Sequence, residues 1–360
     1  MTAWRRRPGS GRPWRLAAVL LAGFAASARA ASVRGSWRLE RVADLPLPGP
    51  AGRFDYQAFD AASGRLYISR MEAGRVLVYD VRRGRAVADV PGFPGATGIT
   101  LAPPLGLAFV SATGSLPSRA LGRGRVRALR LTDLATVADL PAGAFPDGCA
   151  WAAPLRRLFV SDERGGSETV IGGEPPRVLK TLALGGEAGN SAYDADGRRV
   201  LVDVQTRREL AVIDPRALTI VRRLPLPASC EHDHGLLVDD ADSAVFVACD
   251  ANARLLTLSL PDLRAVSVDR VGRDPDVLAL DARRGLLYVA AESGVATVFS
   301  VRGGRPRTLW RGWVGPDAHS VAVDPETGLA YFPLADAGGR PRLRVMRLLR
   351  PLIRAGTKKP

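Results

Sequence analysis

Cys230–Asp250 reads CEHDHGLLVDDADSAVFVACD, and this stretch decides how the chain folds. Two apolar runs, GLLVD and AVFVA, flank a short polar segment, a pattern that predicts a tight hairpin of two buried strands. The start of the first strand and the end of the second lie side by side in an antiparallel hairpin. We therefore expect one shared edge to hold Cys230, Glu231, His232, His234, Cys249 and Asp250.

The second strand of this hairpin recurs along the chain. Its copies are LYIS (66–69), AFVS (108–111), LFVS (158–161), VLVD (200–203), VFVA (245–248), LYVA (287–290) and AYFP (330–333). Successive copies begin 42 to 50 residues apart. A period of this length with strand content alone is typical of a β-propeller.

Each copy contains four predicted strands, of which the innermost in the seventh copy is HSVAVD (319–324). The seventh copy lacks a fourth strand after RLRVMRL (342–348), whereas WRLERVADLPL (37–47) resembles the fourth strands of other copies. Closing the ring with this N-terminal strand removes exposed sheet edges. The sequence predicts an all-β fold: a seven-bladed β-propeller of four-stranded antiparallel blades over residues 31–349, with the last blade completed by the N-terminal strand.

The first 30 residues have the parts of a secretory signal peptide: a basic start, an apolar run over 16–28 and a small-residue cleavage site at Ala28–Ala30. Six arginines and no acids lie there, so their removal lowers the formal net charge from +15 to +9. No later segment is long and apolar enough to span a membrane. We expect a periplasmic or extracellular protein with a basic, disordered tail over 350–360.

The chain resembles the YVTN-repeat, YncE-like family of bacterial β-propellers. The resemblance covers the mature chain and is carried by the LYIS and LYVA strands, CEHDHGLLVD, VACDANARLLTLSL and PDVLALDARRGLLYVAAESGVATVFSV. It implies the propeller fold and says little about function. Some relatives are linked to binding nucleic acid or surface ligands, and more distant propellers act as lactonases or carry redox sites. No catalytic signature of those relatives can be placed on this sequence.

Alignment of the repeats gives one equivalent position at the start of each innermost strand: Asp55, Thr97, Asp147, Gly189, His234, Asp276 and His319. Innermost strands line the central channel of a propeller, so these side chains are predicted to form a ring at one mouth. Neighbouring polar residues complete the predicted ligand-binding set: Asn190, Glu231 and His232. Three interpretations remain open at this stage: a polar ligand pocket, a metal site or a water-filled channel.

A divalent metal ion is the cofactor that this ring could hold, because histidine and carboxylate side chains bind such ions. Only neighbouring blades can share one ion, so the predicted metal ligands are His234, Asp276 and His319. Clustered imidazoles and carboxylates could instead serve as general acid and base. The sequence contains no HExxH, CxxC or P-loop motif.

Other acidic and cysteine residues have predicted structural roles. Cys230 and Cys249 are predicted to form a disulfide that closes a loop of about 19 residues and stabilises the fold by about 3 kcal/mol. Cys149 lies in an innermost strand and is predicted to be a small buried residue. Aspartates that end innermost strands are expected to bind backbone N–H groups in turns: Asp60, Asp194, Asp239, Asp281 and Asp324.

These patterns favour an exported, monomeric, non-enzymatic propeller that binds a small ligand or a protein partner at the channel mouth. The Gly/Ser/Pro-rich insertion at residues 112–124 is a second candidate contact region. The alternative is a metal-assisted hydrolase or lactonase-like enzyme that uses the same His/Asp ring. A weaker alternative is a binder of anionic polymers such as nucleic acid, because the chain is rich in arginine.

Overall fold

The hairpin predicted from Cys230–Asp250 is present in the computed structural model, which describes residues 36–351. Strands β18 (Asp233–Asp239) and β19 (Ala244–Cys249) pair antiparallel, with Asp233 opposite Cys249 and Asp239 opposite Ala244. Two further strands complete this sheet in the order β18, β19, β20, β21. The predicted signal peptide and most of the predicted basic tail lie outside the described residues.

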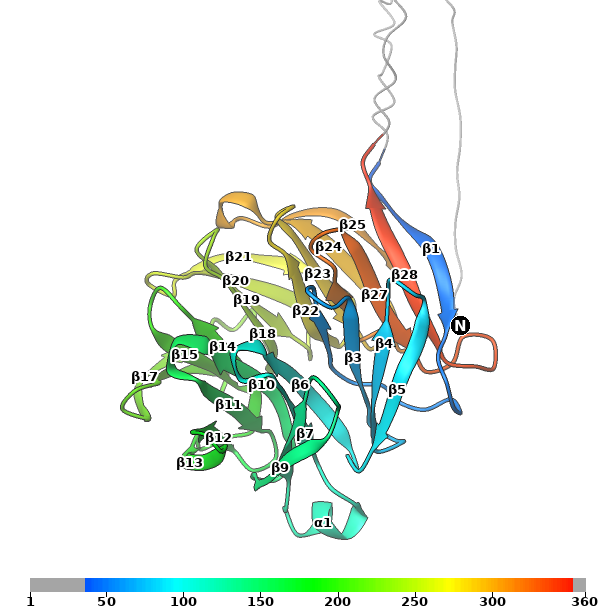
Figure 1. Ribbon diagram of the computed structural model, residues 1–360. Helices are drawn as coiled ribbons and strands as arrows, with labels where there is room; N and C mark the ends of the chain where they lie inside the picture. The colour runs from blue at the N-terminus through cyan, green and yellow to red at the C-terminus, as the bar shows by residue number, and fades with distance from the viewer. Residues whose placement is uncertain (1–35, 352–360) are drawn as a thin grey trace, which may run out of the picture. The chain divides into compact units, whose positions relative to one another are not determined.

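Seven such four-stranded antiparallel sheets form a ring, which confirms the predicted seven-bladed β-propeller (Figure 1). The innermost strands are β2 (Gln57–Asp60), β6 (Ala96–Ala102), β10 (Pro146–Ala152), β14 (Ala188–Asp194), β18, β22 (Pro275–Asp281) and β26 (Ala322–Val323). The second strands are β3 (Arg65–Arg70), β7 (Leu107–Ala112), β11 (Arg157–Asp162), β15 (Arg199–Val204), β19, β23 (Leu286–Ala291) and β27 (Leu329–Leu334). The third strands are β4 (Arg75–Asp80), β8 (Arg125–Arg130), β12 (Ser167–Gly172), β16 (Glu209–Asp214), β20 (Arg254–Ser259), β24 (Val295–Ser300) and β28 (Arg342–Leu349). The outer strands are β5 (Arg85–Pro91), β9 (Thr136–Pro141), β13 (Arg177–Ala183), β17 (Thr219–Pro225), β21 (Ala265–Arg270), β25 (Arg307–Trp313) and β1 (Arg38–Pro46).

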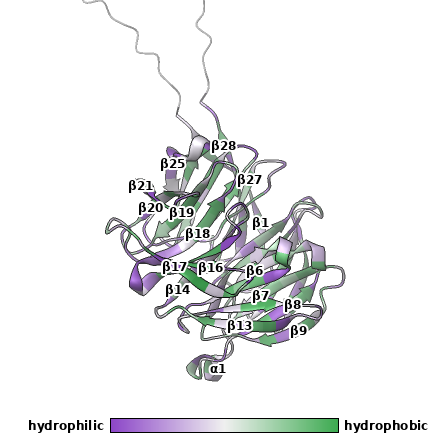
Figure 2. Ribbon diagram, turned by 90° about the vertical axis from the view of Figure 1, so that its left-hand side faces the viewer, coloured by the Kyte–Doolittle hydropathy of each residue, from purple (hydrophilic) through white to green (hydrophobic). Residues whose placement is uncertain are grey.

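The middle strands of the blades form the core. Every residue of β19 and β23 is buried, because neighbouring blades cover both faces of these strands. Outer strands such as β17 are mostly exposed instead. Figure 2 shows the same contrast, with hydrophobic (green) residues along β19 and β27. Continuous apolar runs in the sequence therefore mark strands that are buried on both faces.

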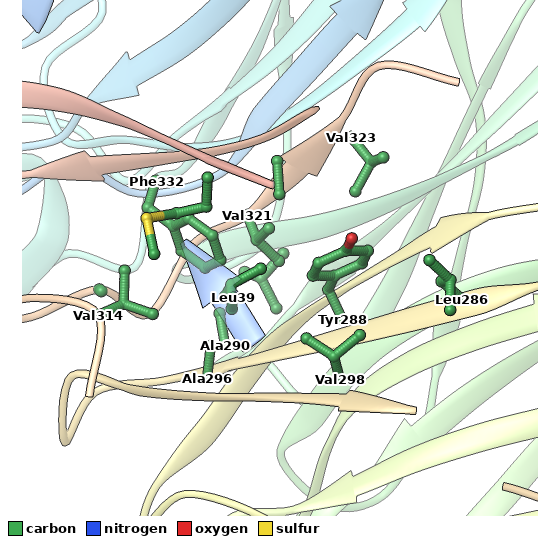
Figure 3. Close-up of a cluster of buried hydrophobic side chains, with 14 of the residues drawn as sticks. Leu39, Leu286, Tyr288, Ala290, Ala296, Val298, Val314, Val321, Val323 and Phe332 are labelled. Atoms are coloured by element: carbon green, nitrogen blue, oxygen red, sulfur yellow. The ribbon is translucent and has the colours of Figure 1, made fainter. Parts of the chain in front are cut away.

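Strand β1 completes blade 7, as predicted. It pairs antiparallel with β28, with Arg38 opposite Leu349 and Pro46 opposite Arg342. Leu39 of β1 is buried in a hydrophobic cluster with residues of blades 6 and 7, including Tyr288 and Phe332 (Figure 3). The two ends of the propeller chain thus share one sheet and one core cluster.

Two segments differ from the predicted strands and loops. The innermost strand of blade 7 is limited to Ala322–Val323, whereas the sequence predicts a strand over 319–324. The carbonyl of His319 instead accepts a hydrogen bond from the backbone N–H of Val277 in blade 6. The insertion at 112–124 contains a short helix, α1 (Leu116–Ala120), in place of a plain loop. Short 3-10 helices η1 (Pro103–Leu105), η2 (Ala153–Leu155), η3 (Gln205–Arg207) and η4 (Arg302–Gly304) form further connections.

The structural roles predicted for Cys230, Cys249 and the turn aspartates are confirmed. Cys230 and Cys249 form a disulfide across a separation of 19 residues. Aspartates at the ends of innermost strands accept backbone hydrogen bonds in the following turns, as for Asp194 with Gly197 and Asp281 with Arg284. Within residues 36–351, no helix has the length and apolar character to cross a membrane.

The closure of blade 7 generates a first prediction. The guanidinium of Arg344 on β28 donates two hydrogen bonds of 2.7 Å to the carboxylate of Asp44 on β1, and a third to the carbonyl of Val314. Replacing Arg344 with alanine should lower the free energy of unfolding by about 1 kcal/mol, because the partly buried carboxylate of Asp44 and the carbonyl of Val314 lose a charged partner. Chemical denaturation measures this change.

The matched control is Arg347→Ala, which removes an exposed arginine from the same strand. This variant should change the free energy of unfolding by less than about 0.5 kcal/mol. Equal effects of the two variants would contradict the role assigned to the Arg344–Asp44 pair.

Candidate functional site

The starts of the innermost strands converge on a pocket at one mouth of the channel. The pocket has a volume of about 470 Å³. Its walls come from blades 1, 3, 4, 5 and 6, and the lining residues are Arg53, Asp55, Tyr56, Met71, Phe145, Asp147, Glu163, Arg164, Gln205, His232, His234, Asp250, Asp274, Pro275, Asp276 and Glu292. Charged and hydrogen-bonding side chains therefore dominate this pocket.

The residues predicted from sequence have different places around this mouth. Five of them line the pocket: Asp55, Asp147, His232, His234 and Asp276. His319 is buried behind the wall, Asn190 lies deeper in the channel, and Glu231 is exposed outside the pocket. The structure thus brings most of the predicted ring together and separates Glu231 from it.

Tyr56, which sequence reasoning missed, forms the floor of the pocket. Its hydroxyl group donates a hydrogen bond of 2.9 Å to Oδ1 of Asn190 in blade 4 and lies 3.4 Å from Oδ2 of Asp147 in blade 3. Tyr56 also lines a second cavity of about 310 Å³ farther along the channel. A single side chain from blade 1 therefore divides the channel.

A glycine leaves room for the side chain of Tyr56 to reach Asn190 across the channel. Gly148 follows Asp147 as Tyr56 follows Asp55, so both residues have the same place in their blades. A Cβ atom at Gly148 would lie 1.6 Å from Oδ1 of Asn190, the atom that accepts the hydrogen bond from Tyr56. The aligned repeats show a tyrosine where blades 2, 3 and 5 have glycine, and this exception is the signal that could have found Tyr56.

His234 and Asp276 form an ion pair between blades 5 and 6. Nε2 of His234 lies 3.3 Å from Oδ1 of Asp276, and its Nδ1 lies 3.1 Å from Oε1 of Gln205. Burial opposes the charged imidazole, but the interaction with Asp276 and the charges of Asp147 and Glu163 outweigh it and raise the pKa of His234 to about 10. His234 is therefore a cation at neutral pH.

Asp55, Asp276 and His319 form a compact cluster where blades 6, 7 and 1 meet. One potential metal-ligand atom from each residue lies within 4.8 Å of the others. The sequence predicted a set with His234 in place of Asp55; the closed ring makes blade 1 a neighbour of blade 7 and so adds Asp55. Burial raises the pKa of Asp55 to about 7, and the charge of His319 moderates this increase.

His319 is held by an acid of its own loop. Nδ1 of His319 lies 3.1 Å from Oδ1 of Asp317. Burial would lower the pKa of His319, but the hydrogen bond to Asp317 and the charge of Asp276 raise it to about 9. Arg53 pairs with Glu292 at 2.8 Å and lies 4.0 Å from Asp317. The cluster therefore has a second layer of charged partners.

The disulfide hairpin positions His232 at the rim. The carbonyl of His232 accepts a hydrogen bond from the backbone N–H of Asp250, and Nδ1 of His232 lies 2.9 Å from Oδ1 of the same aspartate. The side-chain hydrogen bond with Asp250 raises the pKa of His232. Cys230 and Cys249 flank this pair of residues, so the disulfide fixes the edge from which His232 extends.

Four further buried carboxyl groups were also missed. Burial raises the pKa of Asp162 to about 6, of Asp233 to about 7 and of Glu168 to about 8, and it raises the pKa of Asp203 well above its usual value. Asp203 lies between two valines and Glu168 between Ser167 and Thr169, and the sequence analysis assigned neither of them a role.

Cys149 differs from its predicted burial. It is half-buried and lines the deeper cavity, with Sγ 3.2 Å from Oγ of Ser111. Its low-dielectric surroundings raise the pKa of the thiol to about 12. Cys149 is therefore a neutral thiol, not a reactive thiolate.

The fold and the pocket at the channel mouth together define the class of protein: a seven-bladed β-propeller with a polar pocket at one mouth of its channel. Solved structures of the same fold include Kuenenia stuttgartiensis hydrazine synthase, with a TM-score of 0.67, 13% identity and coverage of 86% of this chain and 96% of that chain. The WD40 repeats of RRP9 align with a TM-score of 0.68, 9% identity and coverage of 88% and 99%. No protein-family model and no curated protein matches the sequence. At these identities the likeness shows the fold alone.

The buried carboxyl of Glu168 generates a pH prediction. Its Oε1 accepts a hydrogen bond of 2.6 Å from Oγ of Ser191, and burial raises its pKa to about 8. The protonated form is favoured in the folded state, so its stabilising contribution is present below the usual pKa of 4.5 and is lost as the pH rises through about 8.

Glu168→Gln should therefore lose less stability than the unsubstituted protein between about pH 5 and pH 9. Denaturant unfolding at several pH values measures the two slopes. Glu187→Gln, at an exposed position near the same blade, should keep the original slope. Parallel pH profiles for Glu168→Gln and the unsubstituted protein would contradict the assignment.

Proposed function

We propose that the protein is an exported, non-enzymatic β-propeller that binds a small polar ligand in the mouth pocket. The observation that carries this proposal is the pocket itself, a polar cavity of about 470 Å³ with Tyr56 as its floor. A cavity of this size suits a small molecule. Because the floor is held by hydrogen bonds across the channel, the pocket exists before the ligand binds.

The lining favours a ligand that both donates and accepts hydrogen bonds. His234 and the arginines Arg53 and Arg164 supply positive charge, whereas Asp276 and Glu292 supply negative charge. Burial raises the pKa of Asp55 to about 7, so this carboxyl is partly protonated near neutral pH and can also donate; burial raises the pKa of Asp147 as well. Amino acids, sugars and other small hydrophilic molecules fit this mixed lining.

Export and family membership are part of the same proposal. The predicted signal peptide over 1–30 and the Cys230–Cys249 disulfide support a periplasmic or extracellular location, where disulfides persist. The repeat strands support membership of the YVTN-repeat, YncE-like family. We expect the mature protein to be a monomer.

The charges of the pocket lining also help to distinguish between the two alternative functions, nucleic-acid binding and metal-assisted hydrolysis. Carboxyl groups outnumber positively charged groups at the mouth, which argues against nucleic acid as its occupant. A metal-assisted hydrolase or lactonase-like activity would need a bound ion, and the cluster of Asp55, Asp276 and His319 is the observation that favours this second candidate.

A binding screen tests the proposal. The full mature chain is heated with single amino acids, sugars, polyamines or small carboxylic acids, and a true ligand should raise the melting temperature because it binds only the folded state. Calorimetry then gives the dissociation constant. The double variant Glu163→Ala/Arg164→Ala, in the loop between β11 and β12 at the pocket wall, should weaken binding at least about 10-fold.

The control is Arg264→Ala, which changes an exposed side chain in the turn between β20 and β21, at the opposite ends of the strands. This variant should bind the ligand as the unsubstituted protein does. If none of the four compound classes shifts the melting temperature, or if both variants weaken binding equally, the proposed pocket function is wrong.

A further inference from the structure

We infer that Asp55, Asp276 and His319 form a binding site for one divalent transition-metal ion at the junction of blades 6, 7 and 1. This assignment goes beyond the proposed ligand-binding function and replaces the ligand set expected from sequence. Their potential ligand atoms lie within 4.8 Å of one another. The spacing allows one ion to contact an imidazole nitrogen and two carboxylate oxygens at once.

Burial of the three side chains also supports a bound ion. Asp55, Asp276 and His319 are only 5%, 7% and 1% exposed. Nε2 of His319 is buried and has no hydrogen-bond partner among residues 36–351. Oδ1 of Asp276 lies 3.3 Å from Nε2 of His234, a long distance for a charged hydrogen bond. A buried polar atom without a partner destabilises the folded state. A metal ion in the cluster would give His319 this partner.

The surrounding residues orient the proposed ligands as outer partners do in metal sites. Asp317 binds Nδ1 of His319, which leaves Nε2 for the ion.

Two nearby positive charges oppose a cation in this position. His234 lies 3.3 Å from Oδ1 of Asp276 and contributes the first of them. The charge of Arg53 also opposes a cation, but its pairing with Glu292 partly neutralises it.

The donor set selects the class of ion. One imidazole nitrogen and two carboxylate oxygens suit Zn²⁺, Mn²⁺ or Co²⁺, whereas Mg²⁺ and Ca²⁺ favour oxygen ligands alone. Three protein ligands leave at least one coordination position open. Because Asp55 and Asp276 also line the mouth pocket, the ion would be reachable from it.

Metal titration of the full mature chain tests the site. After treatment with a chelator, the protein is dialysed against Zn²⁺, and bound zinc is measured by mass spectrometry. We expect one zinc ion per chain and a rise in melting temperature with added Zn²⁺. Replacement by Co²⁺ should give visible absorption bands of a site with nitrogen and oxygen ligands.

Three variants identify the ligands. His319→Ala and Asp55→Asn should weaken zinc binding at least about 100-fold, and Asp317→Asn, which acts through His319, about 10- to 100-fold. Asp55→Asn keeps the shape of the side chain, so it remains informative if His319→Ala does not fold. Glu168→Gln removes a buried carboxyl outside the cluster and should bind zinc unchanged.

Two results would overturn the inference: no stoichiometric binding of Zn²⁺, Mn²⁺ or Co²⁺ up to about 100 µM, or zinc binding of unchanged affinity in both His319→Ala and Asp55→Asn. In either case the cluster is an ion-pair network without a metal. The variant Glu163→Ala/Arg164→Ala should keep the zinc ion while it loses the pocket ligand, so the two proposals can fail separately.

Discussion

The pairing of β1 with β28 is the constraint on which the rest of the structure depends. These strands are separated by about 300 residues, yet Arg344 and Asp44 join them with two hydrogen bonds, and Leu39 enters the core of blades 6 and 7. The pairing gives blade 7 its fourth strand, so that all seven blades have four strands. It also makes blade 1 the neighbour of blade 7, and so brings Asp55 to Asp276 and His319.

The narrowness of the channel is the second constraint, and it explains the chemistry of the mouth. Innermost strands approach so closely that glycines are needed where neighbouring backbones or side chains meet, as at Gly148 and Gly235. Charged groups on these strands lose contact with water and acquire shifted pKa values. His234 and Asp276 become a stable ion pair, whereas burial raises the pKa of Asp147 well above its usual value.

The repeat in the sequence was enough to predict the fold, because strand position and period survive in every blade. It also identified the ring position that contributes Asp55, His234, Asp276 and His319. Repeat alignment describes each blade separately, however, and so it does not show which side chains meet across the channel. Tyr56 was missed for this reason. The place of Asp55 in the cluster was missed because only blades adjacent in the sequence were compared.

Blade 7 has a further consequence for how the polypeptide acquires its structure. Its four strands come from both ends of the propeller chain, so β1 cannot pair until β28 has been synthesised. Such a non-local contact slows folding, since a long loop must close before the contact forms. A circular permutant that begins at blade 1 and carries β1 after β28 would assemble every blade from consecutive residues. In the natural order, by contrast, blade 7 is completed only after β28 has been synthesised, although β1 is the first strand of the propeller.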